Sequence, residues 1–60
     1  MNDPALGEVI VEFTRNGAYV KCSAIHVATG REVCAMGPAN EPKAVERVAL
    51  AKLKRALAAG

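Results

Sequence analysis

An alternating segment that runs directly into an Asn-Gly dipeptide restricts the fold of this chain more than any other feature. In 8-EVIVEFTR-15, alternate positions are apolar, and this period of two is typical of a half-buried β-strand. Asn16-Gly17 follows at once, and this dipeptide favours a type I′ turn, whose twist suits a pair of antiparallel strands. The pattern therefore predicts a β-hairpin in which Arg15 lies opposite Ala18.

A second turn is expected in 27-VATGR-31, with Gly30 in the left-handed position of a G1 bulge. This turn would place Val27 opposite Arg31. Counting residues outward from both turns predicts a three-stranded antiparallel meander whose cross-strand pairs are well matched. Its inner face would be apolar and would consist of Val9, Val11, Phe13, Val20, Cys22, Ala24, Cys34 and Met36.

The segment 40-NEPKAVERVALAKLKRALAAG-60 changes to the helical period. Asn40 is a suitable N-cap, and Pro42 suits the first turn of a helix. The helix would cover the inner face of the sheet with one apolar stripe. This stripe consists of Val45, Val48, Ala49, Leu53, Ala56 and Leu57.

These elements predict one small domain of the α+β class. We expect a β-β-β-α domain over residues 8–60, with the C-terminal helix packed on one face of the sheet, after a flexible lead over residues 1–7. A domain of 60 residues buries only about 60% of its unfolded surface, so its core is marginal without a staple, a metal or a second subunit. The net charge of +2 is weak evidence for a polyanionic partner.

Cys22, His26 and Cys34 are the side chains that could bind a soft metal or act as a redox pair, and all three fall on the inner side of the predicted sheet. A structural zinc site needs about four ligands, normally in closely spaced pairs. Free cysteine, in contrast, is among the most frequently buried residue types. We therefore expect two core cysteines and a His26 side chain hydrogen-bonded to Glu32, with a metal site or a redox pair as the alternatives. No catalytic residue and no cofactor are predicted, because no nucleophile-base pair and no phosphate-binding motif emerge.

The outer face of the predicted sheet carries more apolar side chains than a solvated face needs. An apolar patch with a polar rim is typical of an association surface. The predicted partner-binding residues are Ile10, Tyr19, Lys21, Ile25, Arg31, Val33 and Ala35. The edge strands offer a second route to association, by strand addition.

Five short motifs are similar to those of a known family. They are 7-GEVIVEF-13, 17-GAYVK-21, 28-ATGREV-33, Gly37-Pro38-Ala39 and 44-AVERVAL-50. Through them the chain resembles, from about Gly7 to Leu57, a family of small, chiefly alphaproteobacterial proteins that is grouped as a domain of unknown function. The resemblance implies a stand-alone cytosolic protein of unassigned activity, and it implies no catalytic residue.

The sequence as a whole predicts a non-enzymatic interaction module, either a homodimer or a subunit bound to another protein. A cytoplasmic location is expected, because no signal-peptide pattern and no run of about 20 apolar residues is present and both cysteines would be free in a reducing compartment. The alternative is a nucleic-acid-binding domain, since the β-β-β-α order resembles the DNA-binding domains of plant ethylene-response factors and some integrase arm-binding modules. Lys21 and Arg31 would then contact phosphates or bases. No small-molecule substrate is predicted.

Overall fold

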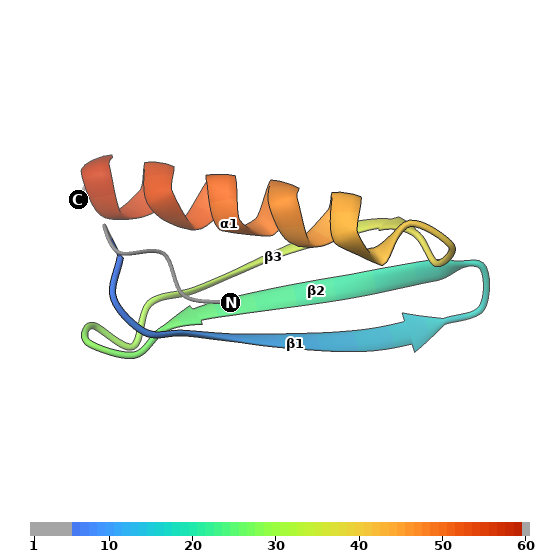
Figure 1. Ribbon diagram of the computed structural model, residues 1–60, viewed down its shortest axis with the longest axis horizontal. Coiled ribbons are helices and arrows are strands. Elements are labelled where there is room, and N and C mark those ends of the chain that lie inside the picture. Colours follow the sequence, from blue (N-terminus) through green and yellow to red (C-terminus); the bar gives the residue numbers. More distant parts are fainter. Residues whose placement is uncertain (1–5, 60) are drawn as a thin grey trace.

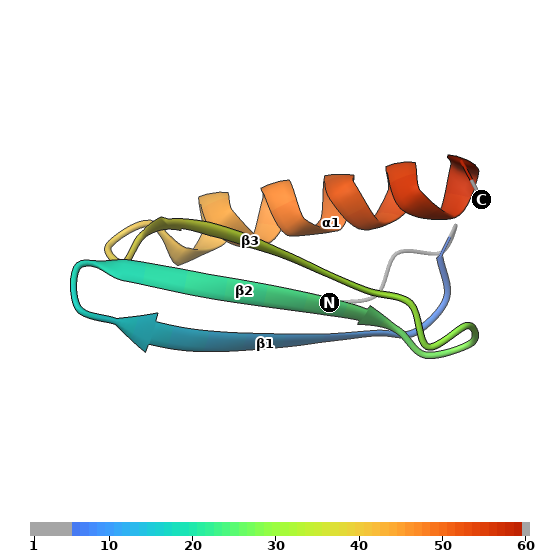
Figure 2. The ribbon, with the colours of Figure 1, turned by 180° about the vertical axis from the view of Figure 1, so that it is seen from behind.

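Residues 6–59 are described by the computed structural model, and they form an antiparallel sheet with one helix on it (Figure 1). The strands are β1 (Val9–Asn16), β2 (Tyr19–His26) and β3 (Glu32–Pro38), in the sheet order β1-β2-β3. The helix α1 (Pro42–Ala59) follows and lies on one face of the sheet, while no described element covers the other face (Figure 2). The predicted α+β fold with β-β-β-α order is therefore confirmed.

Leu6, within the segment that the sequence assigned to a lead, contacts the rest of the domain. Its side chain packs against the core, and its carbonyl oxygen accepts a hydrogen bond of 2.7 Å from Nε2 of His26. Residues 1–5, the rest of the predicted lead, lie outside the described residues.

The first hairpin is present, but its turn lies one residue further along than predicted. Asn16 pairs with Tyr19, so the loop is Gly17-Ala18, and Gly17 has a φ of 64°. No non-glycine residue of the described part has a positive φ, which is the pattern of a type II′ turn and not of the predicted type I′ turn. A type II′ turn needs glycine only at its first loop position, so Asn16 stays in the strand. Each residue of β1 therefore pairs with a residue of β2 two positions further along than predicted. Because a shift by two positions keeps every side chain on the same face, the predicted faces of β1 and β2 are preserved.

The second turn differs from the prediction by one residue, and this reverses the faces of β3. His26 donates its N–H to the carbonyl of Arg31 (2.8 Å), so the loop has four residues, 27–30, where three were predicted. Gly30 has the expected left-handed conformation, with a φ of 74°. A shift of one residue turns every side chain of a strand to the other face. Consequently Cys34 and Met36 are exposed, in contrast to the prediction, and Ala35 is buried.

The register of β3 suits the close approach of α1. Gly37 lies on the inner face opposite Val20, and a Cβ atom added to it would be only 2.6 Å from Cγ2 of Val45. Small residues at this end of β3 therefore let the first turns of the helix approach the sheet. Had Met36 faced inward, as predicted, its long side chain would have occupied this region.

The N-cap of the helix lies one residue later than predicted. Val45 donates its N–H to the carbonyl of Glu41 (3.2 Å), which makes Glu41 the N-cap in place of Asn40 and leaves Pro42 in the first turn as predicted. Of the predicted stripe, Val48 is 53% exposed and does not face the sheet.

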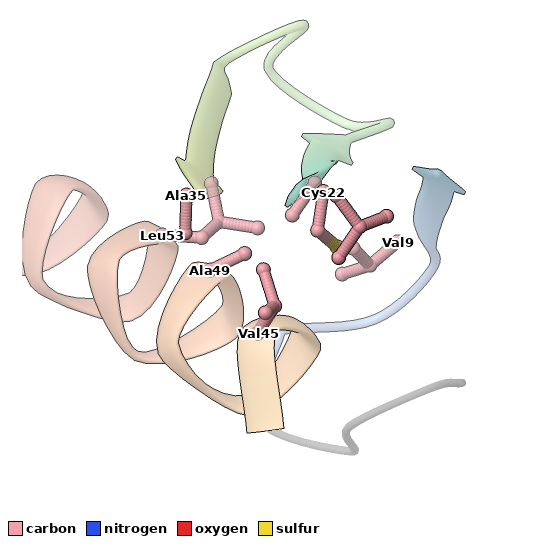
Figure 3. Packing of buried hydrophobic residues seen from close by; sticks show 8 residues of the cluster. Val9, Cys22, Ala35, Val45, Ala49 and Leu53 are labelled. Atoms are coloured by element: carbon pink, nitrogen blue, oxygen red, sulfur yellow. The ribbon is translucent and has the colours of Figure 1, made fainter. Parts of the chain in front are cut away.

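The core lies between α1 and the centre of the sheet (Figure 3). It consists of Val9, Val20, Cys22, Ala24, Ala35, Val45, Ala49 and Leu53. The helix contributes every fourth residue from Val45 to Leu53 and packs mainly on β2 and β3. The inner side of β1 is therefore covered incompletely, and Phe13 remains 46% exposed.

Candidate interaction surfaces

The face of the sheet turned away from α1 is not covered by any described element, and we call it the outer face. The alternation along each strand fixes which side chains it carries. They are Ile10, Glu12, Thr14, Tyr19, Lys21, Ser23, Ile25, Glu32, Cys34 and Met36. Cross-strand pairing brings Ile10 beside Ile25, and Lys21 beside Met36.

Four of the seven predicted partner-binding residues lie on the outer face. These are Ile10, Tyr19, Lys21 and Ile25. The predictions for Val33 and Ala35 are wrong in their placement, because the slip of β3 turns both toward the helix, where Ala35 is 8% exposed and Val33 packs against the core.

Arg31, the remaining predicted residue, lies at the end of the second turn and not on the outer face. Its Nη1 atom donates a hydrogen bond of 3.5 Å to the carbonyl of Ala56 near the end of α1. Its guanidinium group is thus directed toward the helix. A shallow hollow between this turn and the helix is lined by Thr29, Gly30, Arg31, Ala56 and Leu57.

Sequence reasoning missed Met36 and Cys34, which take the places predicted for Val33 and Ala35. Met36 is 65% exposed, the largest value among the exposed large apolar side chains of the described residues. The available signal in the sequence was Thr29, three residues after His26, whose hydroxyl bonds the imidazole ring across the four-residue loop.

The outer face carries both apolar and charged side chains. Ile10 and Tyr19 are 45% and 59% exposed, and Ile25 is half-buried between its neighbours. The charged groups on this face are the carboxylates of Glu12 and Glu32 and the ammonium group of Lys21. This gives apolar side chains spread among a few charges, with a small excess of negative charge.

The second turn is held by His26, whose side chain is 9% exposed. Its Nε2 atom is 2.7 Å from the carbonyl of Leu6, which can only accept, so Nε2 carries the proton. Its Nδ1 atom is 2.8 Å from Oγ1 of Thr29, and that oxygen also accepts the N–H of Arg31 (3.2 Å). The hydroxyl of Thr29 then donates to Nδ1. Both ring nitrogens serve the fold, and the predicted bond from His26 to Glu32 is wrong, since Glu32 lies on the outer face.

The two cysteines lie on opposite faces of the sheet. Cys22 is fully buried, as predicted, whereas Cys34 is exposed on the outer face, so the two free thiols are separated by the sheet. Burial raises the pKa of the Cys22 thiol, and the nearby carboxylate of Glu46 raises it further. Cys34 is also separated from His26, and within residues 6–59 no three His, Cys, Asp or Glu side chains are grouped as metal ligands.

Comparison with known proteins yields one match. The model of a family described as a domain of unknown function, DUF6898, matches residues 6–60. No curated protein and no solved structure matches the chain. The match begins at Leu6, the residue whose carbonyl is bound by His26.

Proposed function

The chain belongs to the DUF6898 family, whose function is unknown, and on this premise we propose that its domain is a non-enzymatic interaction module that binds another protein through its outer face. The expected partner surface carries apolar side chains that meet the apolar residues at the two ends of the outer face, and basic groups beside them. Such groups would complement Glu12 and Glu32.

The observation that carries this proposal is the exposure of apolar side chains on a sheet face that the helix leaves open. Exposed patches of this kind, with charged groups around them, are typical of protein-protein interfaces, in which aromatic residues and Met are enriched. Tyr19 and Met36 are the two most exposed large apolar side chains of the outer face, at 59% and 65%. Both stand near the end of the sheet where the first hairpin turns.

The nucleic-acid alternative receives less support from this surface. Proteins that bind nucleic acid neutralise phosphates with several Lys and Arg side chains. Lys21 lies on the outer face with two carboxylates, and Arg31 is directed toward α1. This alternative predicts retention on DNA or RNA at low salt that is lost when Lys21 is replaced by Gln.

We also propose a cytoplasmic location for the module. Both thiols are free, and their position on opposite faces of the sheet prevents a disulfide within one chain. Free thiols are typical of reducing compartments.

In the described part of the chain, no helix combines the length and the apolar character that a membrane span requires.

The test is affinity capture from a native extract with variants of exposed residues, which leave the core intact. The double variant Ile10→Ser/Met36→Ser removes apolar area from the outer face, and Val48→Ser removes it from the exposed side of the helix as the matched control. We expect one partner to be recovered with the wild-type chain and with Val48→Ser, and to be lost with the double variant. Recovery of the same partner with all three chains, or of none with the wild type, would contradict the proposal.

A further inference from the structure

The outer edge of β1 carries a regular row of unbonded backbone groups. Val27 donates its N–H to the carbonyl of Glu8 (3.2 Å), and in an antiparallel ladder this fixes the alternation along the strand. Even-numbered residues of β1 bond to β2, whereas Val9, Val11, Phe13 and Arg15 direct their N–H and C=O groups away from the sheet. Among the described residues, no hydrogen bond uses these outward groups. The pairing is continuous from 9 to 16, without a bulge, and the strand contains no proline.

The edge of β3 is protected in ways that the edge of β1 is not. Lys52 reaches from the helix and donates a hydrogen bond of 2.6 Å to the outward carbonyl of Cys34. The strand also ends in Pro38, which has no N–H to donate. Proteins use lysines and prolines of this kind to block strand addition at sheet edges. Strand addition is therefore expected at β1.

The inner side of β1 is covered only in part, because α1 packs mainly on the other two strands (Figures 1 and 2), and we call the partly covered apolar strip of Val11, Phe13 and Leu50 the trough. On the helix, Lys52 lies on the flank above β3, and at 100° per residue Glu46 and Leu50 lie on the opposite flank, above β1. Leu50 and Val11 are half-buried, and Phe13 is 46% exposed. Charged side chains of Lys43, Glu46 and Arg47 line a hollow next to Leu50.

We propose that β1 pairs with β1 of a second copy of this chain, in antiparallel orientation, to form a continuous six-stranded sheet. A two-fold axis perpendicular to the sheet relates the copies. Both helices then lie on the same side, and they enclose the two apolar troughs between them. The two outer faces become one continuous surface.

The strand itself selects the register of this pairing. The longest symmetric pairings of the eight-residue strand Val9–Asn16 are centred on Glu12 or on Phe13, and each uses seven residues per strand. Centring on Glu12 places the carboxylates of the two copies directly opposite each other, which is destabilising. Centring on Phe13 places the two Phe13 rings together at the axis and sets each Glu12 opposite Thr14 of the other copy. This second register is the one we infer.

A second copy suits this edge better than an unrelated strand does. The edge of β1 is complementary to itself, because in an antiparallel pair the outward N–H groups of one β1 face the outward C=O groups of the other at matching positions. Seven paired residues extend about 24 Å, and the domain is 32 Å long, so the pairing runs along most of the molecule. A dimer would also stabilise a domain whose core is small.

This inference is independent of the outer-face proposal, and either can fail alone. Amide hydrogen exchange tests the strand pairing residue by residue. In a monomer the amides of Val11, Phe13 and Arg15 face solvent and exchange fast, while those of Glu12 and Thr14 are protected by β2. We expect the odd-numbered amides to become protected as the protein concentration rises. If they exchange fast at millimolar concentration, the inference is overturned, whatever happens at the outer face.

Variants of exposed residues test the trough and the register. Phe13→Lys places a charge at the axis and is expected to weaken the dimer at least about tenfold, whereas Met36→Lys on the outer face leaves it unchanged. A dimer that is lost with Met36→Lys and kept with Phe13→Lys would overturn the pairing through β1.

Position 14 gives a second readout that does not depend on Phe13. In the inferred register, Thr14→Lys gains Glu12 of the second copy and tightens the dimer about threefold or more, and Thr14→Glu loosens it. Within one chain, residue 14 is opposite Lys21, so the stability of the monomer changes in the opposite direction. Equal dimer dissociation constants for both variants would rule out the register centred on Phe13.

Discussion

At Gly37 the sheet leaves no room for a side chain beneath the helix. An added Cβ would lie 2.6 Å from Cγ2 of Val45, closer than carbon atoms can pack. We therefore expect Gly37→Ala to lower the free energy of unfolding by about 1–3 kcal/mol, the usual cost of overpacking. Urea denaturation of the two proteins measures this difference.

A double-mutant cycle separates this contact from any general effect of alanine in β3. Val45→Ala removes the atom in conflict and leaves a cavity in the core. The loss in the double variant Gly37→Ala/Val45→Ala should be smaller than the sum of the two single losses. Strict additivity would mean that the two residues do not conflict.

The two cysteines should differ sharply in reactivity. Cys34 is exposed and Cys22 is fully buried with a raised pKa. A thiol reagent added to the folded protein should therefore modify Cys34 at once, and Cys22 only on unfolding. Mass spectrometry of the labelled peptides distinguishes the two sites. Slow labelling of both cysteines until the protein unfolds would instead support the register of β3 that the sequence suggested, in which Cys34 also lies beneath the helix.

The raised pKa of Cys22 also predicts a loss of stability in alkali. In the unfolded chain a thiol releases its proton near about pH 8.5, whereas folded Cys22 keeps its proton to higher pH. Between these two pKa values the folded state binds more protons, so the free energy of unfolding falls as the pH rises. In the variant Cys22→Ala, we expect the free energy of unfolding to fall less steeply with pH. This variant is also less stable at neutral pH, because it leaves a cavity in the core. If the free energy of unfolding of the two proteins fell equally steeply above a pH of about 9, the raised pKa of Cys22 would be contradicted.

At the scale of elements, the second turn determines which face of β3 meets the helix. Gly30 takes a φ of 74°, with open space around its α-carbon. Gly30→Ala should therefore cost about 1–2 kcal/mol through backbone strain alone. Ala28→Gly in the same loop serves as the control, and its smaller cost is entropic. Equal costs in thermal denaturation would indicate that the left-handed conformation is not what fixes this turn.

The elements themselves were predictable, because the period along the chain switches cleanly from two to that of a helix. The faces of β1 and β2 were also predictable, although the first turn begins at Gly17 and not at Asn16, since the resulting register keeps the parity of the pairing. The face of β3 was not. Its parity depends on whether the loop after His26 has three or four residues. The four-residue loop is held by a bond of His26 to Thr29 within the loop and by a bond to Leu6, 20 residues away in the sequence, and the turn pattern alone does not reveal this second contact.

The same limit explains the outcome for the candidate surface. Ile10, Tyr19, Lys21 and Ile25 lie on strands whose parity the first hairpin sets, and they are placed correctly. The placement of Val33 depended on the second turn and is reversed. The openness of β1 could not be read from the sequence, because it results from the position of the helix above the other two strands.

At the scale of the whole molecule, one helix is too narrow to cover three strands. It buries the centre of the sheet and leaves two surfaces open: the outer face, and the edge of β1 with its trough. We propose a different partner for each, another protein for the first and a second copy for the second. Pairing at β1 would join the outer faces of two copies into one binding surface.

Sedimentation equilibrium of the wild-type chain over a wide concentration range tests this account most directly. The account predicts a mass that rises with concentration and levels off at twice the 6.3 kDa of one chain. The curve should shift to higher concentration for Phe13→Lys. A mass of 6.3 kDa at every concentration up to millimolar would contradict it.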